Sequence, residues 1–295
     1  MLNFFMPYTV VFALVIFPFD ILFAEEVNEY QNFAQQIPHK SHGSWKFGNA
    51  TAEFASLGRQ GYLDNSDISD KVMAHGFQNM YGMFTFQLRE HAKLYHTKVK
   101  IFEIGIGCNS RGTDSPCRSV TLWKNIFGKT LDLWMADVQS VCVATIIASG
   151  KHADVHFLSG DQSDESTLKQ WIQASNGNFD MIIDDGGHSN HLMIKSFYGL
   201  WSEVKPGGYY ILEDAHIGRG EPGPKDAGYP PIIELITAWI DELVTYHHKK
   251  DIIPPHIKEY REKHPLPKGV KFITCVHEAC VIGKCDINDT HCGPQ

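Results

Sequence analysis

Acidic residues recur in the middle of the chain, each close to the end of a short apolar run. They are Glu103, Asp137, Asp161, the pair Asp184 and Asp185, and the pair Glu213 and Asp214. A single carboxylate in such a place commonly caps the following helix or faces solvent. Five successive runs that end in acids or glycines indicate instead that polar groups converge on one site. The pattern therefore predicts a binding or catalytic centre built from strand ends.

Three of these carboxylates, Asp185, Glu213 and Asp214, suit a divalent cation. Oxygen ligands select Mg²⁺, Mn²⁺ or Ca²⁺, and a partly hydrated octahedral ion leaves positions for the oxygens of a substrate. The apolar runs that precede them are expected to form neighbouring strands, which would bring the three carboxylates into one coordination sphere. The alternative is that these acids cap helices or form weak surface pairs with Lys195 and Arg219.

A histidine beside these acids is the candidate general base. His188 follows Asp185 by three residues, and the ordinary histidine pKa of about 6.5 suits removal of a proton from a metal-bound hydroxyl. A lone histidine more commonly has a structural role, but beside three acids we interpret His188 as the base. His191 and His216 lie nearby and are weaker candidates.

The glycines after the first apolar run indicate close approach of the backbone to a ligand. In E-I-G-I-G, from Glu103 to Gly107, Gly105 and Gly107 allow a tight turn. A dinucleotide fingerprint needs G-x-G-x-x-G before a helix, and the third glycine here falls at the wrong spacing, which disfavours NAD. Glu103 and Asp137 suit an amine and a ribose diol, and Asp161 suits a nucleobase amine. S-adenosylmethionine carries all three groups.

The elements that must position these residues alternate between strand-like and helix-like patterns. Short apolar runs cover residues 99–107, 131–137, 153–161, 179–187 and 206–215, with helical spacing at 117–127, 138–150, 164–175, 191–204 and 232–246. This regular alternation predicts right-handed βαβ units, a parallel sheet and a doubly wound α/β fold. The alternating residues 269–285, around His277 and Glu278, are expected to form a terminal antiparallel hairpin.

The segment before the first run is expected to be helical only in its second part. Residues 25–70 are polar, and their glycines are expected to break any long helix. Apolar residues from 69 to 95 recur at three- and four-residue steps, which predicts one amphipathic helix, or two that separate near Gly82. Its Met and Phe residues are interpreted as core.

The motifs of the central segment resemble a known family. E-I-G-I-G, S-V-T-L-W-K-N-I-F, G-D-Q-S-D (160–164), F-D-M-I-I-D-D-G-G-H (179–188) and K-P-G-G-Y-Y-I-L-E-D-A-H (205–216) follow one another as in the metal-dependent class I methyltransferases that O-methylate sugars of macrolide antibiotics. The resemblance covers about residues 99–216. It implies a mostly parallel, seven-stranded, Rossmann-like sheet with the hairpin as its last two strands. It also implies methyl transfer from S-adenosylmethionine to a hydroxyl.

The resemblance implies roles for individual residues. Asp185, Glu213 and Asp214 would hold Mg²⁺ (or Mn²⁺), and His188 would act as the base. The residues implied to bind S-adenosylmethionine are Glu103, Gly105, Gly107, Asp137, Asp161 and Gln162. After Asp214 the chain continues A-H-I-G-R-G-E-P-G-P-K-D-A-G-Y-P-P, unlike the aromatic-rich loop of the macrolide enzymes. The acceptor, a small-molecule or glycan hydroxyl, is therefore expected to sit in a different pocket.

The first 24 residues predict entry into the secretory pathway. The uninterrupted apolar stretch from Phe4 to Phe19 is shorter than the roughly 20 residues of a membrane-spanning helix. We interpret residues 1–24 as a signal peptide cleaved after Ala24, with an uncleaved membrane anchor as the alternative. Further divisions are expected at 25–95 (extension and helical lid), 96–286 (methyltransferase domain) and 287–295 (tail). The acceptor motifs at Asn49 and Asn288 fit a glycosylating lumen.

The seven cysteines fit the same compartment. An odd number leaves at least one thiol outside internal disulfides. Cys108 and Cys117 flank a polar loop and could close it. Four more cysteines fall within the last 21 residues, without the close pairs of a zinc site. Disulfides plus one thiol, in an oxidising lumen, are therefore expected.

Composition excludes one class of partner. There are 26 Lys and Arg against 34 Asp and Glu, a net charge of −8, and no basic run, so nucleic acid is not an expected partner. Three other functions are alternatives: a lumenal protein that binds a nucleoside without turnover, an NAD(P) oxidoreductase, and a secreted structural protein held together by disulfides. The last leaves the carboxylates unexplained. Oligomeric state, a homo-oligomer included, stays open.

Overall fold

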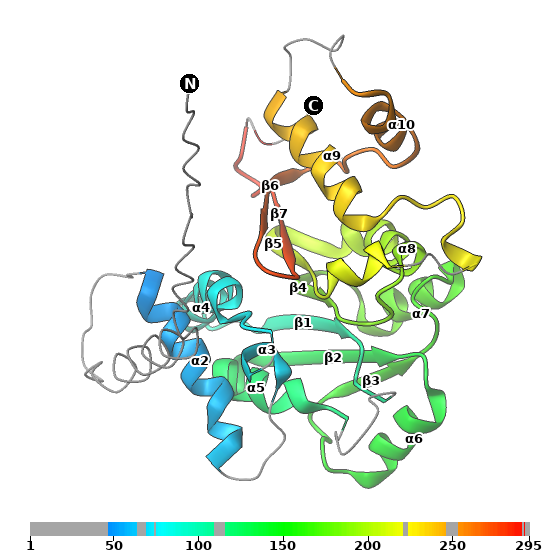
Figure 1. The fold of residues 1–295 in the computed structure, drawn as a ribbon. Helices are drawn as coiled ribbons and strands as arrows, with labels where there is room; N and C mark the ends of the chain where they lie inside the picture. Colours follow the sequence, from blue (N-terminus) through cyan, green and yellow to red (C-terminus); the bar gives the residue numbers. More distant parts are fainter. Residues whose placement is uncertain are drawn as a thin grey trace, which may run out of the picture. The chain divides into compact units, whose positions relative to one another are not determined.

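The computed structural model describes residues 47–63, 69–73, 75–108, 116–220, 224–245, 253–290 and 292. Its strands form one sheet in the order β3-β2-β1-β4-β5-β7-β6 (Figure 1). Their bounds are β1 Val99–Ile104, β2 Leu131–Asp137, β3 His156–Ser159, β4 Phe179–Asp184, β5 Val204–Leu212, β6 Val270–Cys275 and β7 Cys280–Lys284. The first five strands are parallel, β7 is antiparallel to β5, and β6 is antiparallel to β7. The predicted doubly wound sheet and its terminal hairpin are confirmed.

Helices cover both faces of the sheet (Figure 1). They are α2 Phe47–Leu63, α3 Asp70–Met73, α4 Gln78–Tyr95, α5 Arg118–Phe127, α6 Ser140–Ser149, α7 Glu165–Ser175, α8 Asn190–Leu200, α9 Ile232–Thr245 and α10 Pro255–Lys263. Short 3₁₀ turns lie at Gly128–Thr130, Trp201–Glu203, Ala215–Arg219 and Pro224–Asp226. None of the helices in these described ranges is long and apolar enough to cross a membrane.

The core divides into two layers because neighbouring residues of a strand point to opposite faces. On β1, Ile101 packs in one layer with residues of α2, α4, α5 and α6, whereas Phe102 packs in the other with residues of α7, α8 and α9. The N-terminal helices therefore belong to the same core as the sheet: Phe54 of α2 and Met80 of α4 are fully buried in the first layer.

The expectation that glycines interrupt the N-terminal helices is wrong. Helix α2 runs through Gly48, Gly58 and Gly61, and α4 runs through Gly82 without a break. A Cβ atom on Gly82 would lie 2.8 Å from the backbone of Ala50, so the glycine lets α2 and α4 pack backbone to backbone. The separation of the predicted 69–95 helix falls instead between α3 and α4.

The expected closure of a loop by Cys108 and Cys117 is also wrong. Cys108 forms a disulfide with Cys142 of α6, with 6.0 Å between their Cα atoms. Cys117 is 1% exposed at the start of α5, where its thiol faces the core. The polar loop between them, at residues 109–115, lies outside the described residues. Disulfides between Cys275 and Cys280 and between Cys285 and Cys292 confirm the expectation for the C-terminal cysteines.

Candidate active site

The carboxyl ends of β1, β4 and β5 lie side by side and gather the predicted acids. Backbone hydrogen bonds continue past the strands: the amide of Asp185 donates to Ile104 O at 3.0 Å, and that of Glu213 donates to Asp184 O at 3.0 Å. Gly105 permits this approach, since it has φ +98° and an added Cβ would lie 1.9 Å from the carbonyl oxygen of Asp185. The first glycine of E-I-G-I-G is thus required by packing between two strand ends.

Lys71 of α3 occupies the point where these strand ends meet, and sequence reasoning missed it. Its ammonium nitrogen lies 2.8 Å from Asp185 Oδ2, 2.8 Å from Glu213 Oε2 and 3.2 Å from Glu103 Oε1. The side chain is 1% exposed. Burial by itself lowers the pKa of Lys71, but the carboxylates outweigh this effect and raise the pKa well above its ordinary value. The charged lysine therefore holds three strand ends together.

Glu213 is buried in a mixed environment. Its Oε2 accepts a hydrogen bond from Lys71, and its Oε1 accepts one from the hydroxyl of Tyr81 on α4. Burial and the neighbouring Asp185 charge raise the pKa of Glu213 well above the ordinary range. Tyr81 is fully buried, and its hydroxyl contributes this hydrogen bond. A cation near Glu213 would favour its ionised form, since opposite charge lowers a carboxyl pKa.

The structure brings two of the three predicted metal ligands together with the predicted base. Asp185, His188 and Asp214 each offer a ligand atom, and these atoms lie within 4.8 Å of one another. His188 Nε2 is 3.7 Å from Asp214 Oδ2. The other oxygen, Asp214 Oδ1, is buried and accepts no hydrogen bond from any described residue. Glu213 joins the group of Asp185, His188 and Asp214 through Lys71. The metal role of these residues stays a prediction.

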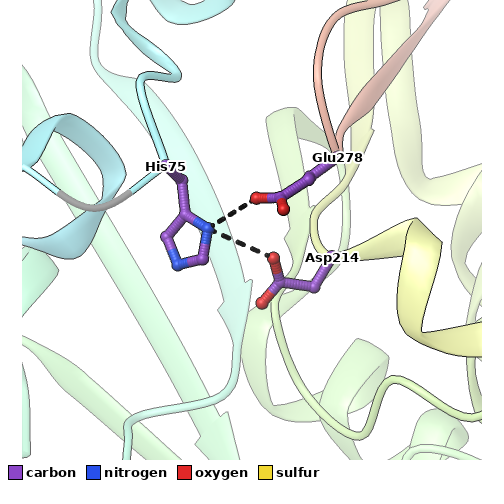
Figure 2. Close-up of side chains that lie close together, drawn as sticks. All are labelled: His75, Asp214 and Glu278. Carbon is purple, nitrogen blue, oxygen red and sulfur yellow. Dashed lines mark hydrogen bonds and ion pairs between the residues drawn. The ribbon is translucent and has the colours of Figure 1, made fainter. Parts of the chain in front are cut away.

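A second basic residue faces Asp214 from the opposite side. His75, between α3 and α4, places Nδ1 2.9 Å from Glu278 Oε2 and 3.5 Å from Asp214 Oδ1 (Figure 2). Sequence reasoning missed His75 too. No helical spacing marks His75, because α3 ends at Met73 and His75 lies outside it.

The residues predicted to bind S-adenosylmethionine lie along the same edge, where they shape the loops. Asp137 accepts hydrogen bonds from the amides of Ile106 at 3.1 Å and Gln139 at 2.9 Å. Asp161 accepts hydrogen bonds from the amide and hydroxyl of Ser163. Gly107 has φ +81°. These contacts leave the cofactor roles of the three residues as predictions.

Glu103 and Gln162, the other candidates for the cofactor, are buried. Glu103 Oε2 accepts hydrogen bonds from Ser119 Oγ at 2.8 Å and Trp123 Nε1 at 2.7 Å, and burial raises the pKa of Glu103. Gln162 accepts a hydrogen bond from the amide of Gly187 at 2.8 Å and donates one to Asp184 Oδ1 at 2.9 Å. Both side chains brace the strand ends from within, and their cofactor-binding roles also stay predictions.

Comparison with known proteins gives relatives that match part of their own length. A demethylmacrocin O-methyltransferase from Streptomyces fradiae is 31% identical over 191 residues, which are 61% of this chain and 44% of that protein. A mycinamicin VI 2''-O-methyltransferase from Micromonospora griseorubida is 30% identical over 154 residues, or 51% of this chain and 36% of that protein. The chain thus spans less than half the length of these curated relatives. No family model matches.

Solved structures extend the comparison to the fold. MycE methyltransferase from the mycinamycin biosynthetic pathway, in complex with Mg, SAH and mycinamycin VI, superposes with a TM-score of 0.55 at 20% identity, over 95% of this chain and 67% of that one. Its complex with Mg and SAH gives 0.53, over 92% and 64%. The resemblance seen in the motifs is confirmed. The chain has the class I methyltransferase fold and is similar in sequence to the sugar O-methyltransferases of macrolide pathways.

Proposed function

We propose that this chain is an S-adenosylmethionine- and Mg²⁺-dependent O-methyltransferase that acts on a hydroxyl of a sugar or similar small molecule. This proposal rests on the group of Asp185, His188 and Asp214 at the carboxyl ends of β4 and β5, whose ligand atoms lie within 4.8 Å of one another. Open α/β sheets bind ligands at this edge. The relatives named as sugar O-methyltransferases, and MycE with Mg and SAH, support the choice of reaction.

The proposed mechanism assigns separate tasks to the residues of the edge. Asp185 and Asp214, with Glu213, would hold Mg²⁺, which supplies Lewis acidity that lowers the pKa of an acceptor hydroxyl. His188 accepts the hydroxyl proton at Nε2, and the Asp214 carboxylate 3.7 Å away stabilises the resulting imidazolium. Residues at or just after the ends of β1, β2 and β3, among them Gly107, Asp137 and Asp161, would hold the cofactor, which would supply the methyl group. Much of the acceleration would come from this positioning.

Lys71 adds a constraint that the residue motifs did not contain. Its ammonium holds Asp185 and Glu213 at 2.8 Å each, so the carboxylates are gathered by the protein's own cation. In the proposed enzyme this charge keeps the buried acids at fixed positions, at the cost of competing with Mg²⁺ for Glu213.

Labelled methyl transfer tests the proposed reaction. Purified protein is incubated with methyl-labelled S-adenosylmethionine and a panel of glycosides and diols, with Mg²⁺ or with a chelator. We expect transfer that requires Mg²⁺, and a loss of about 10²–10⁴-fold when the base is removed in His188→Ala. Asp185→Asn is expected to abolish the metal requirement together with activity. The matched control is Glu165→Gln on α7, whose side chain is 82% exposed.

Two outcomes separate this proposal from the other functions. Cofactor binding by calorimetry without transfer to any acceptor would favour a nucleoside-binding protein. Transfer that is unimpaired in Asp185→Asn would remove the metal site from the mechanism, and unimpaired transfer in His188→Ala would remove the base. A tightly bound nicotinamide cofactor in purified protein would replace the proposed reaction with hydride transfer.

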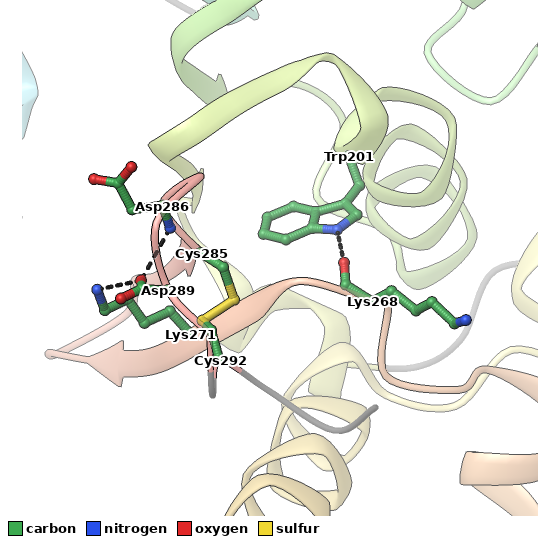
Figure 3. Close-up of a disulfide and its surroundings, with 7 residues drawn as sticks. All are labelled: Trp201, Lys268, Lys271, Cys285, Asp286, Asp289 and Cys292. Atoms are coloured by element: carbon green, nitrogen blue, oxygen red, sulfur yellow. Dashed lines mark hydrogen bonds and ion pairs between the residues drawn. A yellow bond between two sulfur atoms is a disulfide. The ribbon is translucent and has the colours of Figure 1, made fainter.

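We propose further that the chain works in an oxidising compartment of the secretory pathway. Three disulfides lie in the described residues, and such bonds persist in lumenal and secreted proteins. Figure 3 shows the one between Cys285 and Cys292, beside Asp289, which accepts hydrogen bonds from Lys271 Nζ at 2.6 Å and from the amide of Asp286 at 3.0 Å. The acceptor asparagine Asn288 lies in this same loop and is exposed.

Glycosidase treatment tests this location. In a eukaryotic secretory cell, removal of N-glycans from the expressed full chain is expected to lower its apparent mass, and Asn288→Gln is expected to reduce that change. Cleavage after Ala24 is checked by sequencing the N-terminus of the secreted or lumenal protein. A chain that keeps its leader, carries no glycan and remains in the cytosol would refute the assignment.

A further inference from the structure

We propose that His75, Asp214 and Glu278 form a second divalent-cation site, and that Asp214 bridges it to the site at Asp185. The proposal goes beyond the proposed methyltransferase function, and its test does not require methyl transfer. The three residues come from separate elements: the link between α3 and α4, the end of β5, and the turn between β6 and β7. Their side chains point toward one another (Figure 2).

The geometry of the group already matches that of metal ligands. His75 Nδ1 is 2.9 Å from Glu278 Oε2 and 3.5 Å from Asp214 Oδ1, and one ligand atom of each residue lies within 4.8 Å of the others. Adjacent ligands of an octahedral ion, at bond lengths of about 2.1 Å, are separated by about 3.0 Å. The side chains are between 15% and 27% exposed, so water can complete the coordination shell.

Asp214 gives the observation that points to a ligand. Its Oδ1 faces His75 at 3.5 Å, yet this atom is buried and accepts no hydrogen bond among the described residues. Its Oδ2 faces His188 on the other side, at 3.7 Å. A carboxylate whose two oxygens face two different donor sets has the arrangement of a bridging ligand in a two-metal centre, in which the ions are about 3.5–4 Å apart.

The local charge favours more than one divalent ion. The carboxylates of Asp185, Glu213, Asp214 and Glu278 gather at this edge, and Lys71 contributes one positive charge among them. With all four carboxylates ionised and the facing His75, His188 and His216 neutral, Lys71 and a single divalent ion leave this set negative. Because like charges that are gathered in a partly buried site repel one another, a second ion would stabilise the arrangement.

The donor types select the class of ion. The proposed second site has one imidazole nitrogen and two carboxylates, whereas Mg²⁺ and Ca²⁺ prefer oxygen ligands alone. Imidazole suits Zn²⁺ and other transition metals, and carboxylates suit Mn²⁺. We therefore assign to this site an ion of the Mn²⁺ or Zn²⁺ class, and the site at Asp185 keeps the ion of the proposed reaction.

Counting Mn²⁺ ions tests the proposal against its alternative, a protein-only ion pair between His75 and Glu278. Metal-free full-length protein is titrated with MnCl₂ by calorimetry, and its electron paramagnetic resonance spectrum is recorded. We expect two Mn²⁺ per chain and a spectrum of two spin-coupled ions. Changes in outer-shell residues cost about 10–100-fold in metal affinity, so loss of a direct ligand in Glu278→Gln should weaken one of the two sites at least as much.

Matched variants assign each ion to its residues. His277→Ala removes an imidazole that is 84% exposed and 3.7 Å from Glu278, and both ions are expected to remain. Asp185→Asn is expected to leave one ion, which Glu278→Gln then removes. His75→Ala gives a second test of the site, and if that variant does not fold, as judged by circular dichroism, Glu278→Gln decides alone.

The outcomes distinguish this site from the metal of the proposed function. Suppose that the protein binds a single ion, and that Glu278→Gln lowers its affinity whereas Asp185→Asn does not. This result would support the second site and refute the site at Asp185. The proposal would be overturned if the protein binds a single ion whose affinity is unchanged in Glu278→Gln. It would also be overturned if the wild-type protein binds no Mn²⁺.

Discussion

Replacing Lys71 with methionine tests the internal cation of the site. The ammonium is 1% exposed and lies 2.8–3.2 Å from Asp185, Glu213 and Glu103. Methionine fills a similar volume without charge, so Lys71→Met leaves three neighbouring carboxylates without their common partner. Removing one member of a buried ion pair costs about 3–5 kcal/mol, because the remaining charge is uncompensated. We expect the free energy of unfolding in chelator to fall by this amount.

Divalent ions should recover part of the loss, and this makes the prediction specific. An ion that binds only the folded state at 100 times its dissociation constant adds about 2.7 kcal/mol. Urea unfolding of the wild type and of Lys71→Met is measured in chelator and in excess Mg²⁺. The control is Lys169→Met, which removes an exposed i,i+4 partner of Glu165 and is expected to change the free energy of unfolding little, because exposed ion pairs contribute little to stability. The reasoning is refuted if Lys71→Met in chelator is as stable as the control.

Three further predictions concern the scaffold of the site. Gly105→Ala places a Cβ 1.9 Å from the carbonyl of Asp185 at φ +98°, and we expect urea unfolding to show a loss of at least about 1–3 kcal/mol; an unchanged midpoint would contradict the packing. Hydrogen bonds from the hydroxyls and amides of the first turn of α7 lower the pKa of Asp164 to about 2. Its stabilising contribution is therefore complete above pH 3.8 and is lost as pH falls toward 2, and an NMR titration that returns a pKa near 3.8 would exclude the cap. Cys142→Ser opens a disulfide with a sequence separation of 34 and should cost about 2–4 kcal/mol; a thermal midpoint equal to that of the wild type would show that the disulfide contributes nothing.

The sequence predicts the sheet well because its strands are short, apolar and followed by acids or glycines. Each of the five predicted parallel strands is found, and the terminal hairpin adds two. The N-terminal helices are less predictable, because glycines such as Gly82 weaken a helix by local propensity. Here they serve close packing of α2 on α4, a tertiary contact that no local pattern contains.

The acids and His188 of the candidate site were predictable from the sequence, whereas Lys71 and His75 were not. Asp185 and Asp214 follow strands, and parallel strands bring their carboxyl ends to one edge, so topology alone brings them together. Lys71 comes from the four-residue helix α3, far earlier in the chain, and His75 comes from the link that follows this helix. A lysine in such a segment is ordinarily solvated, and its burial follows from long-range contacts with β1, β4 and β5.

The shared core of α2, α4 and the sheet has a practical consequence for anyone who shortens this chain. A version that starts at β1 would keep all of the motif residues and look complete by alignment. It would nevertheless discard Lys71 and Tyr81, which neutralise and hydrogen-bond Glu213, and expose the layer that Phe54 covers. We expect such a fragment to be insoluble, so inactivity in it would say nothing about catalysis.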